Sequence, residues 1–62
     1  MIRALREQQN LTQAELAHKL MVSQQAVAKW ENGEALPTAN KLPELARILG
    51  CTIDDLFAKD QM

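Results

Sequence analysis

The sequence predicts a small all-α domain, built as a compact bundle of five short helices. Apolar residues recur at the three- and four-residue spacing of helices, whereas the apolar-polar alternation typical of strands never lasts more than a few positions. Helix-capping residues and helix-ending glycines divide the chain into short segments. The composition favours the same fold class, because it is rich in Ala, Leu, Glu, Gln and Lys and holds two Gly and two Pro.

The first predicted helix covers residues 2–9 and ends at Asn10. The second begins at Thr12, because Thr12 and Glu15 have the spacing of a capping box, in which each side chain binds the backbone amide of the other residue. The side chains that we expect to face inward on these two helices are Ile2, Leu5, Leu16, Ala17 and Leu20.

A tight connection through Met21 and Val22 leads to the third predicted helix, over residues 24–31. Ser23 is a favourable N-cap for this helix, and Gly33 can adopt the left-handed conformation that ends helices. The residues that we expect on its inner side are Ala26, Val27 and Trp30.

A loop is predicted over residues 34–39, and a fourth helix from residue 40 or 41 to residue 49. Pro43 fits the start of this helix, because amides in the first helical turn have no intrahelical partners. Gly50 ends it. The expected inward-facing residues are Leu42, Leu45, Ala46 and Leu49.

The fifth predicted helix is capped by Thr52, which forms a second box-like pair with Asp55. The carboxylates of Asp54 and Asp55 suit the positive end of the helix dipole. We expect residues 58–62 to fray. The expected inward-facing residues are Ile53, Leu56 and Phe57.

Length and composition exclude several function classes. We expect the 62 residues to form a single domain over 1–62, in the cytoplasm and without a membrane partner, because no apolar run is as long as a membrane span. The lone Cys51 can form no internal disulfide, and we expect it in the core rather than as a redox sensor. Because no nucleophile–base pair, metal-ligand cluster or phosphate-binding glycine loop stands in the sequence, we expect no enzyme, cofactor, metal or small-molecule ligand.

The short link between the second and third helices forces them to cross sharply, as in a helix-turn-helix. The outer face of the third helix then presents Gln24, Gln25, Ala28 and Lys29. A glutamine amide can pair with both N7 and N6 of adenine, and a lysine can reach guanine or a phosphate. Ser23 and Ala28 can meet a thymine methyl group. The alternative is that these are ordinary solvated side chains, and the net charge of −1 gives DNA binding no support.

The chain resembles the Cro/CI (XRE-like) helix-turn-helix family, and in particular the DNA-binding domains of lambdoid phage repressors. The matching segments extend from about residue 2 to residue 57, and their ordered spacing is more specific than any one of them. They are Leu5-Arg6, residues 11–17 (LTQAELA), residues 22–27 (VSQQAV), residues 30–33 (WENG), Pro37, residues 42–46 (LPELA) and residues 49–56 (LGCTIDDL).

This resemblance implies a role for each matching position. It implies base contacts by Ser23, Gln24, Gln25 and Lys29 and phosphate contacts by Gln13, Asn32 and the backbone amide near Lys41. It also implies a structural ion pair between Arg6 and Glu31, for which the alternative is that Arg6 is a solvated charge or touches phosphate directly. Met21 departs from the family, in which Gly or Asn is common at this turn position; a left-handed Met would be strained.

The function that the resemblance implies is sequence-specific binding of double-stranded DNA, with the helix over 24–31 in the major groove, by a transcriptional regulator and foremost a repressor. The implied target is a near-palindromic operator bound by a homodimer, at least on DNA, with an interface near Leu36, Cys51 and Ile53. The alternative is a protein-interaction module, such as an antitoxin or a regulatory partner that uses the same fold.

Overall fold

Local capping signals set the ends of the helices in the computed structural model, which describes residues 2–56. Within this range the structure is all-α and has no strand. The described elements are α1 (Ile2–Gln8), α2 (Gln13–Leu20), α3 (Gln24–Asn32), α4 (Leu42–Leu49) and α5 (Ile53–Leu56). None of the described helices is long and apolar enough to cross a membrane. Phe57 and the predicted frayed segment lie outside the described residues.

The two predicted capping boxes are both present. In the first, the Glu15 amide donates to the Thr12 hydroxyl at 3.0 Å and the Thr12 amide donates to the Glu15 carboxylate at 2.8 Å. In the second, the same two bonds join Thr52 and Asp55, each at 3.1 Å. Each box satisfies amide donors that the start of a helix leaves without intrahelical partners.

The helix boundaries differ from the predicted ones by one or two residues. α1 ends at Gln8 rather than residue 9, and α3 extends to Asn32. α4 begins at Leu42, with Lys41 as its N-cap and Pro43 in its first turn, as the proline requires. Helix ends commonly shift by this much, because the terminal turn holds few intrahelical hydrogen bonds.

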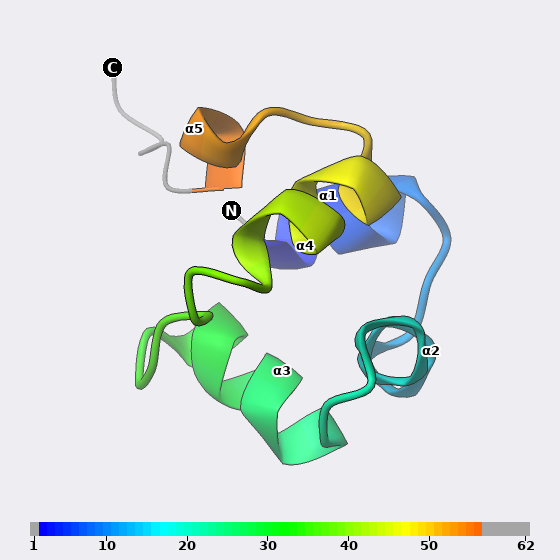
Figure 1. Cartoon of the computed structure of the whole chain (residues 1–62). Coiled ribbons are helices and arrows are strands. Elements are labelled where there is room, and N and C mark those ends of the chain that lie inside the picture. Colours follow the sequence, from blue (N-terminus) through cyan, green and yellow to red (C-terminus); the bar gives the residue numbers. More distant parts are fainter. Residues whose placement is uncertain (1, 57–62) are drawn as a thin grey trace.

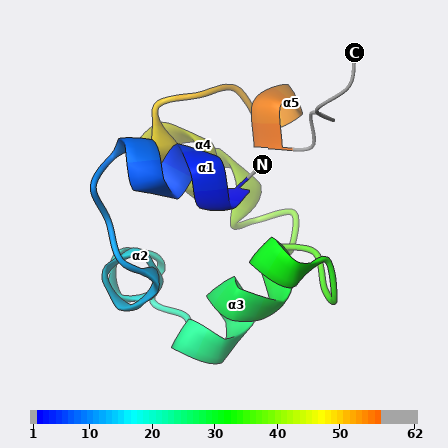
Figure 2. The same ribbon diagram turned by 180° about the vertical axis from the view of Figure 1, so that it is seen from behind.

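The helices surround one core, with α3 at one edge of the molecule and α5 at the opposite edge (Figures 1 and 2). α1 and α4 lie one behind the other between these edges, and α2 packs mainly against α3. The most deeply buried side chains come from three different helices, so the core joins segments that are far apart in the sequence. They are Leu16, Leu20, Val27, Leu45 and Leu49.

The predicted inward faces are confirmed for most positions. Ile2, Ala17, Ala46 and Leu56 are also buried, and Trp30 is half-buried against the same core. Ile53 is the exception, because its side chain is 40 % exposed and the prediction that it packs inward is wrong. α5 is a single turn of four residues that buries Leu56, and its first residue, Ile53, lies on the solvent side.

The turn between α2 and α3 contains a strained residue. Met21 has φ 59° and ψ 42°, the left-handed region, and its side chain is 88 % exposed. The Met21 amide donates to the His18 carbonyl and the Val22 amide donates to the Ala17 carbonyl, which is the bonding pattern of a helix ended by a left-handed residue. The Cβ atom of Met21 makes this conformation unfavourable.

Replacing Met21 with asparagine, which tolerates left-handed backbone, should therefore stabilise the chain by about 0.5–1 kcal/mol. Little packing is lost, because the Met21 side chain lies in solvent. Urea unfolding followed by circular dichroism measures the difference. Lys19→Asn is the matched control, since it places the same residue at an exposed helical position of α2, where it should destabilise by a few tenths of a kcal/mol. A loss of stability in Met21→Asn would show that the left-handed conformation of Met21 is not strained.

Candidate nucleic-acid interface

The packing of α2 against α3 fixes which side of α3 faces outward. Ser23 caps α3, with the Ala26 amide donating to its hydroxyl at 3.1 Å. Val27 is completely buried, whereas Gln24, Gln25 and Lys29 are exposed. The inner stripe of α3 thus anchors the helix, and its amide and ammonium groups point to the outside.

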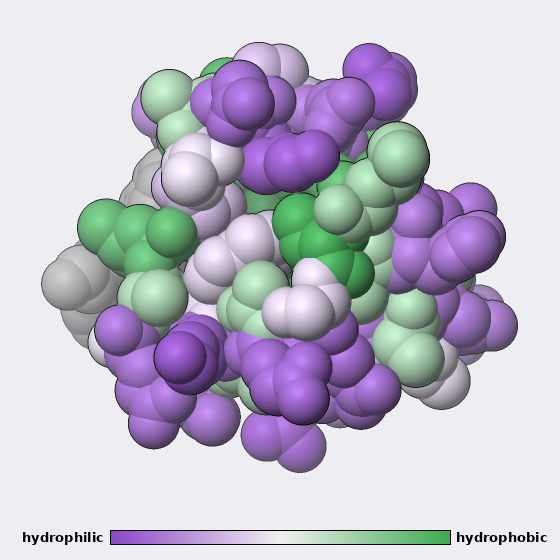
Figure 3. Space-filling view, turned by 60° about the horizontal axis from the view of Figure 1, so that its bottom comes forward, coloured by the Kyte–Doolittle hydropathy of each residue, from purple (hydrophilic) through white to green (hydrophobic). Residues whose placement is uncertain are grey.

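Figure 3 shows many hydrophilic side chains on the side of the molecule that carries α3, with some clearly hydrophobic groups in green among them. On this side Gln24, Gln25 and Ala28 of α3 and Gln13 of α2 line a shallow hollow of about 330 Å³. The structure thus brings three of the predicted contact residues together: two predicted to touch bases and one predicted to touch phosphate. Asn32 is exposed at the last position of α3.

The expected ion pair between Arg6 and Glu31 is present and buried. Nε of Arg6 donates to Oε2 of Glu31 at 2.6 Å, and Nη2 donates to Oε1 at 3.3 Å. Nη1 donates to the Leu11 carbonyl at 2.7 Å, so the guanidinium also holds the α1–α2 connection. The two side chains are 10 % and 3 % exposed, which excludes the alternatives of a solvated Arg6 or an arginine facing phosphate in this structure.

Gln13 extends this pair toward the outer face of α3. Its Nε2 donates to Oε1 of Glu31 at 2.9 Å. Burial of the Glu31 carboxylate acts to raise its pKa. The hydrogen bonds from Arg6 and Gln13, together with the positive charges of Arg6 and Arg3, outweigh burial and hold the pKa below the ordinary glutamate value. The pKa of Arg6 is raised, chiefly by its hydrogen bond to Glu31. Both groups therefore stay charged over the physiological pH range.

Two other predicted contact residues already have partners inside the protein. Nζ of Lys41 donates to the Leu20 carbonyl at 2.9 Å and lies 3.8 Å from Glu44. The Lys41 backbone amide donates to the Thr38 carbonyl at 2.9 Å, so a phosphate contact by this amide requires that bond to be exchanged. The hydroxyl of Ser23 accepts from Ala26, as described above, and keeps its own proton for another acceptor.

Sequence reasoning missed two of these contacts. The Gln13–Glu31 and Lys41–Leu20 bonds join residues 18 and 21 positions apart, and neither pair has a local pattern that predicts it. Both depend on how the helices cross. The sequence showed only that Gln13 is the first residue of a capped helix and that Lys41 is a cation at the start of the fourth helix. A lysine can bind free carbonyls at the end of another helix, but the sequence does not say which helix.

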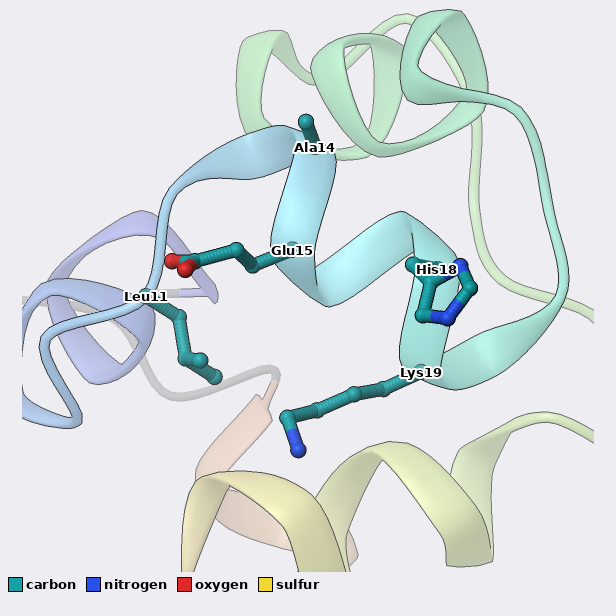
Figure 4. A pocket seen from close by; sticks show the side chains of 5 residues that line it. All are labelled: Leu11, Ala14, Glu15, His18 and Lys19. Carbon is teal, nitrogen blue, oxygen red and sulfur yellow. The ribbon is translucent and has the colours of Figure 1, made fainter.

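A second hollow lies on the opposite side of α2 from its α3 contact, and Figure 4 shows the five side chains that line it. Glu15 is occupied by the capping box, and the charged and polar lining residues are exposed. His18 is exposed as predicted. These features are typical of a solvated helix face. The lining residues are Leu11, Ala14, Glu15, His18 and Lys19.

Cys51 is half-buried and packs against the core, as predicted. Burial raises the pKa of its thiol, and the charge of Asp55 adds to the rise. A raised pKa lowers the thiolate fraction and hence the reactivity toward oxidants. The side chain therefore serves packing.

Known proteins are similar to this chain over most of its length. The pattern of the helix-turn-helix family matches residues 2–56. The chain is 36 % identical over 61 residues to the HTH-type transcriptional activator BcrR of Enterococcus faecalis and 39 % identical over 50 residues to the cryptic phage CTXphi transcriptional repressor RstR of Vibrio cholerae. It is 48 % identical over 40 residues to the 26 kDa repressor protein of Escherichia phage HK022.

These matches cover 98 %, 81 % and 64 % of this chain for BcrR, RstR and the HK022 repressor, respectively. They cover 30 %, 45 % and 17 % of those proteins. The chain thus spans less than half the length of each relative.

Removal of one partner of the Arg6–Glu31 pair should destabilise the chain far more than removal of both. Arg6→Met leaves a buried carboxylate without its cation and should cost about 3 kcal/mol or more. Arg6→Met combined with Glu31→Leu leaves no buried charge and should cost less, about 1 kcal/mol, chiefly for the lost bond from Arg6 to the Leu11 carbonyl. Chemical unfolding at neutral pH measures both. Equal losses of unfolding free energy in the two variants would show that the unpaired Glu31 carboxylate carries no penalty, and hence that the two charges do not stabilise each other.

The pH dependence offers an internal check on the same variants. Because the pKa of Glu31 is lowered in the folded chain, the stabilisation that its charge provides is complete above the unfolded glutamate pKa of about 4.3. It is lost as the pH falls through the folded pKa. The free energy of unfolding should therefore fall less steeply on acidification in the double variant than in the native chain.

Proposed function

The chain belongs to the helix-turn-helix family, and from this premise we propose that it binds double-stranded DNA sequence-specifically as a transcriptional regulator, foremost a repressor. The observation that carries the proposal is the outer face of α3. It exposes Gln24, Gln25 and Lys29, while the opposite stripe of the same helix is locked into the core by Val27. A helix held in this way can enter the major groove as a rigid body.

The chemistry of that face suits adenine-containing sites. Each glutamine amide offers one donor and one acceptor, which match N7 and N6 of adenine in the major groove. Gln24 and Gln25 stand in the first turn of α3, which is the part of a recognition helix that reaches base edges. Lys29 lies one turn further on and adds a cation for guanine or phosphate. Ser23 supplies a hydroxyl beside the first base contacts.

Phosphate contacts would then flank α3 on both sides. Gln13 stands in the first turn of α2, where backbone amides and the helix dipole favour an anion. Asn32 is exposed at the far end of α3, and the start of α4 at Lys41 lies beyond it. Such contacts set the register of the protein on DNA without selecting sequence.

A homodimer would place two copies of α3 in successive major grooves of a near-palindromic operator. Two large exposed apolar side chains support an interface that includes the α3–α4 loop and α5: Leu36 is 75 % exposed and Ile53 is 40 % exposed. Cys51 is half-buried between α4 and α5. Apolar side chains that lie in solvent are stabilised when a partner covers them.

Selection from a pool of randomised duplexes tests the proposal. The native chain should recover an adenine-containing motif with two half-sites about 34 Å apart, one helical turn of DNA. The combined Gln24→Ala, Gln25→Ala and Lys29→Ala variant should recover none, although its circular dichroism and thermal unfolding match the native chain. Recovery of a single half-site would contradict the dimer. Recovery of no motif by the native chain would favour a protein-interaction module on the same fold.

Gln24→Ala and Asn32→Ala should weaken DNA binding in different ways. Loss of a base contact at Gln24 should cost about 1–3 kcal/mol per half-site and relax the preference at one base position. Loss of a phosphate contact at Asn32 should weaken all sequences by a similar factor and preserve their ranking. Equilibrium binding to the selected duplex and its single-base variants separates the two effects. The same ranking for both variants would rule out base reading by Gln24.

A further inference from the structure

Gln13 connects the buried ion pair to the outer face of α3. Gln24, Ala28 and Glu31 are spaced i, i+4 and i+7 along α3, so they form one stripe of this helix. The Gln13 side chain lies against that stripe, because its Nε2 bonds Glu31 and the residue lines the hollow together with Gln24 and Ala28. One side chain of α2 is thus held where the proposed base and phosphate contacts meet.

The bond to Glu31 leaves Gln13 with groups to offer DNA. A primary amide has two N–H donors and an oxygen with two lone pairs. Nε2 gives one hydrogen to Oε1 of Glu31 at 2.9 Å, and the second N–H and the amide oxygen remain. A glutamine without such an anchor samples many rotamers, and DNA binding would have to order it. The bond to Glu31 orders the amide before DNA arrives.

The charge of Glu31 does not oppose this role. An unpaired carboxylate behind a phosphate contact would repel the phosphate. Here the Arg6 guanidinium donates to both oxygens of Glu31, at 2.6 and 3.3 Å, so the pair carries no net charge. Glu31 can therefore act as a hydrogen-bond acceptor for Gln13 without presenting a net negative charge to DNA.

We propose that Glu31 is a positioning residue of the DNA interface, which acts by fixing the Gln13 amide for a phosphate of the bound duplex. Arg6 acts one step further back, by neutralising Glu31. The inference rests on the proposed DNA-binding function and adds a part to it: the buried pair supports the phosphate contact as well as the fold.

Two double variants separate this role from stability. Both carry Arg6→Met, so both lose the ion pair and the bond to the Leu11 carbonyl. Glu31→Leu in the first removes the acceptor for Gln13, whereas Glu31→Gln in the second keeps an amide oxygen at this position. Each is also made together with Gln13→Ala. Arg3→Gln with Glu7→Gln is the control, because it removes an exposed ion pair of the same charge types from α1.

The probe is a synthetic duplex with the motif that the native chain selects, titrated at several salt concentrations after thermal unfolding confirms that each variant is folded. The Arg6→Met/Glu31→Leu variant should bind about two- to tenfold more weakly than the native chain, which is the effect expected for one side chain left unordered. The Arg6→Met/Glu31→Gln variant should recover most of this loss. In the Gln13→Ala background the two should bind equally. The slope of log affinity against log salt should stay unchanged, because no cation that meets phosphate is removed.

Other results would overturn the inference. If the native chain and the Arg6→Met/Glu31→Leu variant bind equally, or if both double variants weaken by the same factor, Glu31 does not act through Gln13 while DNA binding itself stands. If the difference between the double variants persists in the Gln13→Ala background, the route through Gln13 is wrong. If the native chain binds no duplex, the proposed function fails and this inference fails with it.

Discussion

The buried contact between Arg6 and Glu31 is the interaction on which the arrangement of the helix-turn-helix depends. Arg6 belongs to α1 and Glu31 to the last turn of α3, and the same guanidinium binds the Leu11 carbonyl in the connection to α2. One cation therefore ties together three parts of the chain. In a chain of 62 residues, which buries a smaller share of its surface than a large domain does, loss of either partner alone leaves a buried charge that the small core cannot compensate. Gln13 extends the network to the outer surface.

The proposed DNA-binding face carries little positive charge, in keeping with the net charge of −1 of the chain. Several of the chain's cations are engaged within the protein: Arg6 with Glu31, Arg3 with Glu7 and Lys41 with the Leu20 carbonyl. What the face of α3 offers instead is mostly neutral amide groups, with Lys29 among them. Amides contribute specificity through paired donors and acceptors rather than long-range attraction. A protein of this kind should depend more on the fit of its operator than on bulk phosphate attraction.

Most of the fold follows from local patterns in the sequence, because helix ends are decided by local chemistry. Each capping bond joins residues three positions apart, as at Thr12–Glu15, Thr52–Asp55 and Ser23–Ala26. Gly33 and Gly50 end their helices with left-handed backbone. The outward placement of Gln24 and Gln25 also followed, since Val27 fixes the inner side of α3.

The remaining features depend on how helices cross, which spacing along the chain does not determine. The Gln13–Glu31 and Lys41–Leu20 bonds form only when α2 meets α3 and α4 at particular angles. The Arg6–Glu31 pair was expected through the family resemblance, and residue spacing alone left a solvated Arg6 open. Ile53 was predicted to face inward together with Leu56 and Phe57, but the single helical turn of α5 buries Leu56 and leaves Ile53 exposed.

An NMR titration of the ¹⁵N-labelled chain with its selected duplex tests whether α3 and the Gln13 amide form the DNA-binding face, as proposed. The largest changes should fall on the side-chain amides of Gln13, Gln24 and Gln25 and on the backbone of the first turn of α3. The hollow lined by Leu11, His18 and Lys19 on the other side of α2 should change little. The opposite distribution, with the largest changes at that hollow and none on α3, would show that α3 does not form the DNA-binding face.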